Sequence, residues 1–586
     1  MGKFSLQDRI LFMIILRFIL SLCFSLILLS PVVVLAADNT NPQQPSIIRY
    51  ESIHHPVVGQ SGMVVTQNEI ATQIGLDILE QGGNAVDSAV AVGFALAVTL
   101  PRAGNLGGSG YMLLYLNELN ETISLDFRSV APAAARLEDF LNEEGEIDYD
   151  PLTYGPKAAA VPGTVAGLYA AWERYGLMDW QDILQPAIDL ATKGITVTPD
   201  LAYALEQAVP VMSAYPSSIE IYTKENSDFY QSNEIFVQKD LAWSLQQISE
   251  HGADAFYKGA IAEKITEFMK SENAYITADD LANYKVRDRA PISTIYRDHR
   301  VVSMPPSSTG GLALLQMLNV LSEFDLSAMP QGSANSIHII AEVMKRVNAN
   351  RRKGIGDMDF VHVPIAGMLS DSLATDIASD INLSQATSVN DIEGKDALHY
   401  ESPDTTHYSI VDKEGNGVSL TYTLGYSFGS GLVVPGTGIL LDNQMRNFYH
   451  REPEHANAML PGKRMISTMA PTLVFDKDNN LRIVTGTPGG SRIHTSILQV
   501  LINVIDYGLN IAEATHRPRI YQGWRSAELG LEQGISSNAA EILANMGHEI
   551  EIQQTMGSTQ SIMIINEILY GSADPRRPGA LALGLD

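Results

Sequence analysis

The residue whose chemistry this sequence displays most clearly is Thr405. It begins the segment TTHYS at positions 405–409 and directly follows Asp404. If the peptide bond between Asp404 and Thr405 were cut, Thr405 would carry a free α-amine beside its own hydroxyl. Such an amine titrates near neutrality, with a pKa of roughly 7.7–8.0, and can take the hydroxyl proton to make the oxygen a nucleophile. The plain alternative is a threonine-rich edge of a β-hairpin.

Two other motifs suit acyl transfer, in which a nucleophile attacks a carbonyl and an oxyanion develops. Residues Thr487–Ser491 follow a strand-like segment and precede a helical one, so the N–H groups of Gly489 and Gly490 could face a developing negative charge. Arg128 ends a strand-like run and could bind a substrate carboxylate through two parallel hydrogen bonds. A tight turn and a surface ion pair are the respective structural alternatives.

Other kinds of site find little support in the sequence. The glycine-rich segment Gly104–Gly110 lacks the G-x-G-x-x-G spacing and follows a helix-like run, so a dinucleotide site is not expected. His54, His55 and His338 show no partner at metal-ligand spacing, and we predict neither a metal site nor a cofactor. The only cysteine, Cys23, lies in an N-terminal apolar segment, which excludes a cysteine nucleophile from the mature chain.

The composition and the N-terminus indicate an exported acidic protein. The chain has 586 residues, 45% of them hydrophobic, and a formal net charge of -28, which argues against nucleic acid and anionic membranes as partners. Lys3 and Arg9 precede or flank the apolar run Ile10–Leu35, and Ala36 follows it, a pattern typical of a secretory signal cleaved after Ala36. The run is also long enough to be a membrane anchor. We expect cleavage, no membrane association afterwards, and a periplasmic or secreted protein.

The local pattern predicts a β-hairpin that would hold Thr405 in place. Residues 405–411 and Val418–Thr423 form its strands around a turn at 412–417. Because side chains alternate along a strand, His407 and Ser409 should share one face and Tyr408 the other.

Apolar periodicity predicts the remaining elements. Residues 371–404 are polar and are expected to be an exposed linker that leads to Thr405. Helices gather in the first part of the chain and strands in the second, so the predicted fold class is α+β, with sheets between helical layers. The predicted helices span 68–81, 85–100, 164–175, 180–193, 336–352, 493–507 and 538–546, and further strands span 111–116, 122–127 and 481–485.

Six motifs occur in one order along nearly the whole chain. They are GNAVDSA at 83–89, AGNLGG at 103–108, VPGTVAG at 161–167, TTHYS at 405–409, PGGSR at 488–492 and MGSTQS at 556–561. In this order they resemble the γ-glutamyltranspeptidase family, of the N-terminal nucleophile hydrolase superfamily. The resemblance runs from about Val57 to about Pro575.

The resemblance implies a four-layer αββα sandwich, formed when a precursor cleaves itself between Asp404 and Thr405. Removal of residues 1–36 would leave a large subunit of residues 37–404 and a small subunit of residues 405–586, interwoven in one core as a heterodimer. Thr405 would attack first its own preceding peptide bond and later the γ-glutamyl amide of glutathione or a related compound. Water, or the amine of an amino acid or peptide, would then resolve the acyl-enzyme.

The resemblance also implies roles for the residues around the nucleophile. Thr423 would hydrogen-bond the amine or hydroxyl of Thr405, and Gly489 with Gly490 would form the oxyanion hole. The α-carboxylate of the glutamyl group would be held by Arg128, Ser467 and Thr468.

In the family, an Asn, a Gln or Glu, and an Asp read the α-ammonium of the glutamyl group. In this chain those positions are Gly425, Gln444 and Asn447, so two depart and only the glutamine is kept. Loss of the aspartate would remove a charge-assisted hydrogen bond of roughly 1.5–3 kcal/mol, or about tenfold or more in binding, and Gly425 would open the pocket further. The link between Phe448 and Ser467 is short, as in lidless members of the family, so bulky donors could enter.

We therefore carry three hypotheses, of which the first two are enzymes. The first is an exported γ-glutamyl transferase and hydrolase. The second is a glutaryl-type acylase on the same scaffold, similar to glutaryl-cephalosporin acylases, whose acyl group has no α-amine; Gly425 and Asn447 favour it. A self-cleaved envelope protein that acts as a binding module belongs to another class, and the intact nucleophile and glycine pair disfavour it.

Overall fold

The computed structural model describes residues 52–224, 228–351, 354–392, 404–524 and 526–586. The chain divides into two compact units, Met1–Ile53 and His54–Asp586, and every helix and strand given below belongs to the second. The predicted signal segment and Cys23 lie outside the described residues. Within those residues, no helix has both the length and the apolar character needed to cross a membrane.

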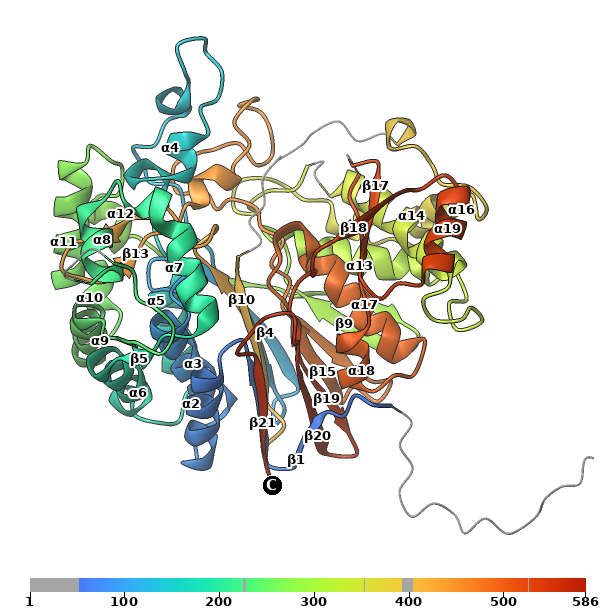
Figure 1. The fold of residues 1–586 in the computed structure, drawn as a ribbon, viewed down its shortest axis with the longest axis horizontal. Helices are drawn as coiled ribbons and strands as arrows, with labels where there is room; N and C mark the ends of the chain where they lie inside the picture. The colour runs from blue at the N-terminus through green and yellow to red at the C-terminus, as the bar shows by residue number, and fades with distance from the viewer. Residues whose placement is uncertain (1–51, 225–227, 352–353, 393–403, 525) are drawn as a thin grey trace, which may run out of the picture. The chain divides into compact units, whose positions relative to one another are not determined.

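Two seven-stranded sheets form the centre of the second unit (Figure 1). Neighbouring strands in both sheets run antiparallel. In order across the first sheet, the strands are β1 (Val57–Gly59), β20 (Ile568–Ala573), β19 (Gln560–Ile565), β15 (Leu481–Gly486), β14 (Thr472–Phe475), β9 (His299–Ser303) and β8 (Ile292–Tyr296). Across the second sheet they are β21 (Leu581–Leu585), β2 (Gly62–Thr66), β10 (Thr406–Asp412), β11 (Gly417–Thr423), β3 (Ser109–Leu116), β4 (Glu121–Phe127) and β7 (Arg287–Arg289).

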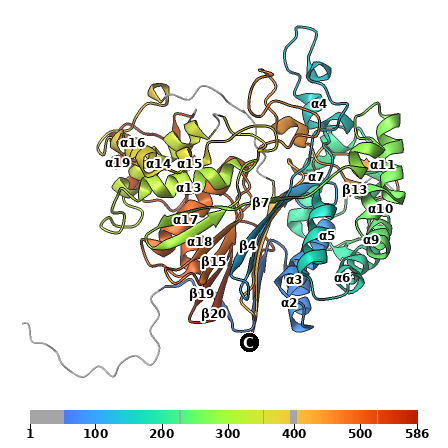
Figure 2. The ribbon, with the colours of Figure 1, turned by 180° about the vertical axis from the view of Figure 1, so that it is seen from behind.

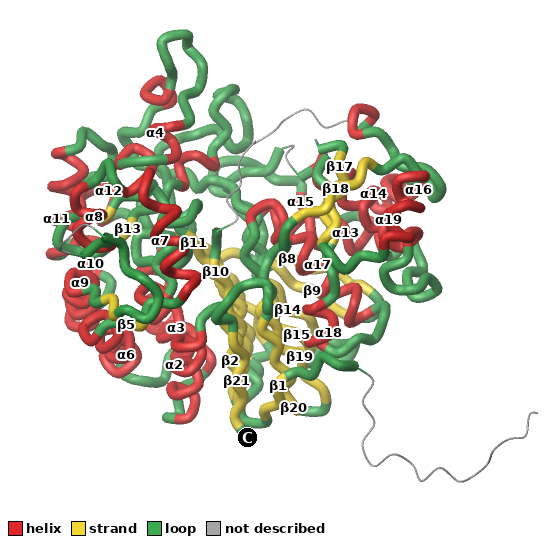
Figure 3. Tube along the Cα trace, viewed as in Figure 1, coloured by secondary structure: helices red, strands yellow, loops and turns green. Residues whose placement is uncertain are grey.

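Helices cover the outer face of each sheet, which Figure 2 shows from behind and Figure 3 by element type. Strands β10 and β11 of the second sheet contact β15 of the first, so the inner faces pack together and the predicted αββα sandwich is confirmed. The layer on the second sheet contains α2 (Glu69–Glu80), α3 (Ala85–Thr99), α5 (Thr164–Tyr175), α6 (Trp180–Lys193), α7 (Pro199–Met212), α8 (Pro216–Tyr222), α9 (Lys239–His251), α10 (Asp254–Tyr257), α11 (Ala260–Ser271) and α12 (Ala278–Ala282). The layer on the first sheet contains α13 (Thr309–Leu321), α14 (Ala334–Asn350), α15 (Ile365–Met368), α16 (Asp371–Ser379), α17 (Ile493–Ile505), α18 (Ile511–His516) and α19 (Ser537–Asn545).

Smaller elements lie around this sandwich. They are the sheet of β16 (Ile520–Gln522), β17 (Glu528–Glu532) and β18 (Glu549–Gln553), the pairs β5 (Ile195–Thr196) with β6 (Ile235–Phe236) and β12 (Val433–Val434) with β13 (Ile439–Leu440), the helix α4 (Asp150–Thr153), and the 3-10 turns η1 (Leu137–Phe140), η2 (Pro156–Ala158), η3 (Val389–Asp391), η4 (Gln444–Asn447) and η5 (Gly490–Arg492).

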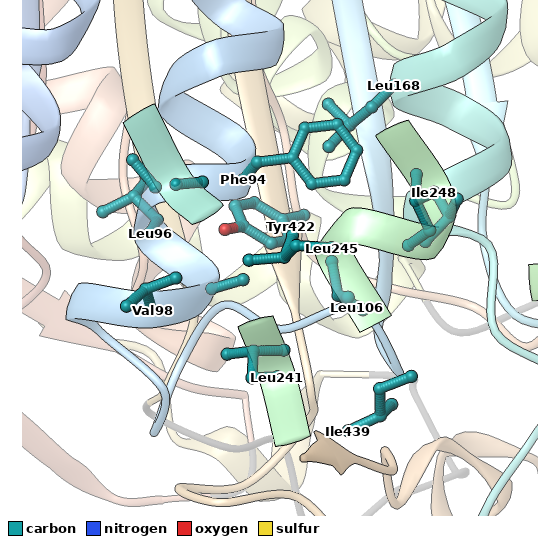
Figure 4. Close-up of a cluster of buried hydrophobic side chains, with 14 of the residues drawn as sticks. Phe94, Leu96, Val98, Leu106, Leu168, Leu241, Leu245, Ile248, Tyr422 and Ile439 are labelled. Carbon is teal, nitrogen blue, oxygen red and sulfur yellow. The ribbon is translucent and has the colours of Figure 1, made fainter. Parts of the chain in front are cut away.

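Helix α3 anchors the hairpin of β10 and β11. It is apolar almost all round and wholly buried, as expected for a helix covered on every side, and its N-terminus is closed by a capping box of Asn84 and Asp87. The hydroxyl of Tyr408 donates to the carbonyl of Ala89 at 2.8 Å, and that of Tyr422 donates to the carbonyl of Gly93 at 2.9 Å. Figure 4 shows Tyr422 within the surrounding apolar cluster.

The other face of β10 points toward the first sheet, as the alternation predicts. Ser409 Oγ donates to the carbonyl of Gln560 on β19 at 2.9 Å, and His407 Nε2 lies 3.1 Å from Ser409 Oγ. Because the serine proton is used for Gln560, the proton between His407 and Ser409 belongs to Nε2. Burial lowers the pKa of His407 to about 3, so this imidazole is neutral at physiological pH.

Strands from before and after Thr405 alternate within each sheet. In the second sheet, β10 and β11 lie between β2 and β3, and in the first sheet β20, β19, β15 and β14 lie between β1 and β9. A cut before Thr405 would therefore leave both pieces held by backbone hydrogen bonds and a shared core.

Most predicted elements are confirmed, including the hairpin and the seven predicted helices. The expectation of a linker at 371–404 is wrong in part, because α16 and η3 form within it. Ser370 caps α16 through a hydrogen bond to the N–H of Leu373, a local signal that the overall polarity of the segment concealed. Residues 393–403 of that segment lie outside the described residues.

Candidate active site

Thr405 directly precedes β10, Thr423 ends β11, and both residues are buried. Thr405 Oγ1 donates a hydrogen bond to Thr423 Oγ1 at 3.3 Å. Thr423 Oγ1 in turn donates to the carbonyl oxygen of Asp404 at 2.8 Å, and it accepts from the N–H of Gly425 at 2.9 Å. One hydroxyl therefore orients the oxygen of Thr405 and also polarises the carbonyl of the Asp404–Thr405 peptide bond.

The side chain of Asp404 is held by cations that the sequence did not single out. Its Oδ1 lies 3.0 Å from Arg102 Nη1 and 3.5 Å from Arg577 Nη1. Arg102 also pairs with Asp200 through Nη2 at 3.1 Å. Arg102 follows α3, Asp200 begins α7, and Arg577 lies between β20 and β21, so three distant segments meet at the residue before the nucleophile.

Gly489 and Gly490 form the turn between β15 and α17, with φ angles of +136° and +56° that favour glycine. A Cβ on Gly489 would lie 3.1 Å from the Cα of Gly557, so the two glycines also allow the chains to approach closely. One cavity of about 750 Å³ is lined by both Gly489 and Asp404. The turn and Asp404 therefore border one cavity, and we expect the N–H groups of the turn to face an oxyanion there.

A buried ionic network supports the segment that packs against this turn. Arg519 Nη2 lies 2.6 Å from Asp574 Oδ2, which also accepts from the N–H of Thr559 at 2.9 Å. Glu532 Oε1 accepts from the N–H of Met556. Burial alone would raise the pKa of Asp574, but the neighbouring arginines lower it below its usual range. Sequence reasoning missed this network, because its members are far apart in the chain.

Arg128 is completely buried, so the alternative of a surface ion pair is wrong. Its Nη1 donates to Ser109 Oγ at 3.1 Å and its Nη2 to Gln444 Oε1 at 2.7 Å. The backbone N–H of Arg128 donates to Asp126 Oδ1 at 3.0 Å, and its carbonyl accepts from the hydroxyl of Tyr284 at 2.9 Å. The guanidinium is therefore rigidly placed, as a group that binds a carboxylate must be.

Gln444 joins Arg128 to the other residues expected to read the glutamyl group. Gln444 Oε1 also accepts from Asn447 Nδ2 at 2.9 Å, so two donors of the protein use this oxygen. Asp442, which the sequence did not single out, accepts from the N–H of Gln444 at 3.3 Å and from the hydroxyl of Ser129. Burial raises the pKa of Asp442 to about 7. The sequence signal that could have pointed to Asp442 is its position as a charged residue directly after the apolar run 439–441.

Gly425 has a structural reason to be glycine. Its φ is +95°, and a Cβ there would lie 2.1 Å from Asn443 Oδ1. That oxygen accepts from the N–H of Tyr426 at 3.0 Å, which holds the Asn443 amide in place. The expectation that Gly425 opens the pocket is therefore wrong, because the Asn443 side chain fills the space beside it.

Ser467 and Thr468 are linked to Arg128 only indirectly. The N–H of Ser467 donates to the carbonyl of Ser307 at 3.1 Å, and Ser307 Oγ lies 2.7 Å from the hydroxyl of Tyr111. Tyr111 on β3 pairs with the residue two positions before Arg128. The hydroxyl of Ser467 accepts from the N–H of Met469 at 3.2 Å, and Thr468 is buried.

His338 has a partner that its sequence neighbourhood did not reveal. Its Nδ1 lies 2.8 Å from Nε2 of His548, and Glu342 completes a group whose geometry could hold a metal ion. Glu342, however, is ion-paired with Lys345 at 2.7 Å and also with Arg346. Two buried cations at this carboxylate disfavour a further cation, so the absence of a metal site stays our prediction.

An αββα sandwich with a threonine at the start of a central strand defines the class of N-terminal nucleophile hydrolases. The family model of gamma-glutamyltranspeptidase matches residues 71–584. The chain is 44% identical to the glutathione hydrolase proenzyme of Escherichia coli (strain K12) over 545 residues, which covers 91% of this chain and 93% of the relative. The chain belongs to the gamma-glutamyltranspeptidase family.

Two solved structures show the same fold. The cephalosporin acylase from Bacillus halodurans is similar with a TM-score of 0.83 and 28% identity, over 93% of this chain and 99% of that chain. The gamma-glutamyltranspeptidase of Helicobacter pylori is similar with a TM-score of 0.55 and 40% identity, over 57% of this chain and 95% of that chain.

Proposed function

We propose that this chain is a self-processing γ-glutamyl transferase and hydrolase that cleaves the γ-glutamyl amide of glutathione or a related compound. The observation that carries this proposal is the hydrogen-bond chain from Thr405 through Thr423 to the carbonyl of Asp404. Family membership supports it, as does the name of the Escherichia coli relative, a glutathione hydrolase proenzyme.

In the first stage, the chain cuts itself. Thr405 Oγ1 attacks the carbonyl carbon of Asp404, so that an ester bond forms and the peptide C–N bond breaks. The hydroxyl of Thr423, 2.8 Å from the carbonyl oxygen, stabilises the negative charge that develops there. The nitrogen of Thr405 takes up a proton to become an amine, and water hydrolyses the ester. Once the signal is removed, the products are residues 37–404 and 405–586.

In the second stage, the new amine of Thr405 serves as the base for its own hydroxyl. The oxygen attacks the γ-carbonyl of the donor, the oxyanion faces the N–H groups of Gly489 and Gly490, and the leaving amine takes the proton. Water, or the amine of an amino acid or peptide, then attacks the ester, which restores the hydroxyl of Thr405. No metal or cofactor is required for either stage.

The donor is positioned by its α-carboxylate. Arg128 would bind this group, with Ser467 and Thr468 as further partners, and Gln444 and Asn447 would lie toward the α-ammonium. The burial of Arg128 supports this role, because a desolvated guanidinium binds a carboxylate more strongly than an exposed one.

A glutaryl-type acylase is the second candidate, and the contacts of Gln444 favour it. An α-ammonium needs acceptors, yet Gln444 Oε1 already accepts from Arg128 and Asn447, and Asn447 carries no negative charge. The similar fold of the Bacillus halodurans cephalosporin acylase is consistent with such a specificity.

Release of p-nitroaniline from γ-glutamyl and glutaryl p-nitroanilides decides between the two candidates. The two compounds differ only in the α-amine. A clear preference for the γ-glutamyl compound supports the transferase, whereas equal or reversed rates would make the chain an acylase.

The two subunits are proposed to remain together as a heterodimer, since strands from both alternate within each sheet. Residues 1–36 are proposed as a signal peptide, and the mature enzyme as periplasmic or secreted, on the sequence pattern alone.

A further inference from the structure

Gln444 turns its amide oxygen toward the protein and its amide nitrogen away from the same neighbours. Its Oε1 accepts from Arg128 Nη2 at 2.7 Å and from Asn447 Nδ2 at 2.9 Å. A guanidinium group donates hydrogen bonds and cannot accept them, so the Gln444 atom that faces Arg128 must be the oxygen. The orientation of the amide is therefore fixed by Arg128, and Nε2 is directed elsewhere.

Two donors of this pair have no acceptor within the described part of the chain. Gln444 Nε2 and Arg128 Nε are both buried, and neither has a hydrogen-bond partner there. The other two nitrogens of Arg128 donate to neutral oxygens, those of Ser109 and Gln444, at 3.1 and 2.7 Å. Buried donors are rarely left unpaired in folded proteins, so these N–H groups point to a ligand that supplies acceptors.

The unpaired nitrogen of Gln444 is connected to the nucleophile by a short series of contacts. A Cβ built on Gly425 would lie 3.1 Å from Gln444 Nε2. The N–H of Gly425 donates to Thr423 Oγ1 at 2.9 Å, and Thr423 Oγ1 accepts from Thr405 Oγ1 at 3.3 Å. The amide nitrogen therefore lies beside the backbone that the partner of the nucleophile holds, near an acyl group carried by Thr405.

We propose that Gln444 binds the carboxylate of the donor's acyl group, together with Arg128, and does not read its α-ammonium. Because Arg128 is a cation, the acceptor that best suits both unpaired donors is a carboxylate. The substrate class that follows is the monoamides of dicarboxylic acids, which include γ-glutamyl and glutaryl amides. This inference rests on the proposed function and reassigns Gln444 from the α-ammonium to the carboxylate, so that Asn447 alone lies toward the ammonium.

Gln444→Glu tests the proposal, because it replaces only the amide nitrogen by oxygen. The new side chain keeps an acceptor for Arg128 and Asn447, but it turns a negative oxygen toward the ligand. The kcat/KM for glutaryl p-nitroanilide should fall by about a hundredfold or more, since two carboxylates then meet. The γ-glutamyl compound should lose as much, so the ratio of the two donors should stay nearly constant. A rise of that ratio by about tenfold or more would show that Gln444 reads the ammonium, and would overturn the proposal.

A third donor separates this contact from simple neutralisation of Arg128. Glutaramoyl p-nitroanilide carries a terminal amide in place of the terminal carboxylate of the glutaryl compound. In Gln444→Glu its kcat/KM should rise by about tenfold over that of the wild type, because its N–H meets the new acceptor. Neutralisation of Arg128 alone would lower the rate for the carboxylate without raising the rate for the amide, and that result would also overturn the contact.

Gln246→Glu is the matched control, because it makes the same change at an exposed position of α9 and should leave the rates for all three donors unchanged. A crystal structure of the mature wild type with glutarate is a second measurement that needs no variant. Gln444 Nε2 should lie within about 3.2 Å of a carboxylate oxygen, and a structure without that contact would overturn the proposal. If the mature wild type releases no p-nitroaniline from either carboxylate donor, the proposed function fails, and the glutarate structure still decides the role of Gln444.

Discussion

Replacement of Thr423 by valine removes one hydroxyl at almost constant volume and should arrest maturation. That hydroxyl accepts from Thr405 Oγ1 at 3.3 Å and donates to the carbonyl of Asp404 at 2.8 Å. Loss of a single oxyanion donor slows acyl transfer by about 10²–10³-fold, or roughly 3–4 kcal/mol in the barrier. The variant also leaves the N–H of Gly425 without its acceptor, which costs about 1–3 kcal/mol of stability.

The assay follows the uncut chain by gel electrophoresis and intact mass from the moment of purification. We expect the half-life of the precursor to lengthen by about 10²–10³-fold in Thr423→Val. Circular dichroism and a thermal melt on the same sample establish that the uncut variant is folded, so that slow cleavage reports on chemistry.

Thr406→Val is the matched control for this experiment. Thr406 is the next residue after the nucleophile, is equally buried, and its Oγ1 has no hydrogen-bond partner within the described part of the chain. Its replacement should leave the rate of self-cleavage unchanged. Maturation of Thr423→Val at the wild-type rate would refute the reasoning, as would an equal delay in both variants.

Three further predictions test other parts of the account. Asn447→Asp restores a negative charge beside Gln444 and should raise kcat/KM for a γ-glutamyl over a glutaryl p-nitroanilide by about tenfold or more; an unchanged ratio would mean that this position does not face the ammonium. Asp574→Asn leaves Arg519 without its buried partner at 2.6 Å and should lower the free energy of unfolding by about 3–5 kcal/mol, which denaturant titration measures; a loss below 1 kcal/mol would contradict the role of the network. Burial lowers the pKa of His407 to about 3 in the folded protein, whereas in the unfolded chain the imidazole binds a proton near pH 6.5. His407 should therefore lower the free energy of unfolding by about 2 kcal/mol between pH 7 and pH 5. Thermal melts at the two pH values should show a smaller decline in His407→Gln than in the wild type; parallel declines would show that the imidazole is not buried neutral.

The hairpin and the long helices could be predicted because local sequence determines them. Strand alternation placed His407 and Tyr408 on opposite faces, and apolar periodicity found α5 and α6 at their observed bounds. The strand order could not be predicted in this way, since β10 lies beside β2 through contacts across more than three hundred positions. The polarity of residues 371–404 also led to the incorrect prediction of a linker throughout, because α16 buries only a few apolar residues.

In the candidate site, too, residues marked by local sequence could be predicted, and residues defined by tertiary contacts could not. Thr405, Thr423 and the glycine pair were suggested by residue type and motif; the structure hydrogen-bonds Thr405 to Thr423 and places Gly489 and Asp404 in the lining of one cavity. Asp442 and Arg102 could not be found from local pattern, because the burial and the partners of an isolated charged residue are set by the tertiary fold. The environment of Gly425 likewise depends on a side chain eighteen positions away.

The most direct test of the central claim is the intact mass of the purified wild type and of Thr405→Ala. The account predicts two chains for the wild type, the smaller with the mass of residues 405–586 and an N-terminal threonine, and a single uncut chain for the variant. A variant that still splits at this bond, or a wild-type small chain that begins at another residue, would contradict the assignment of Thr405 as the nucleophile.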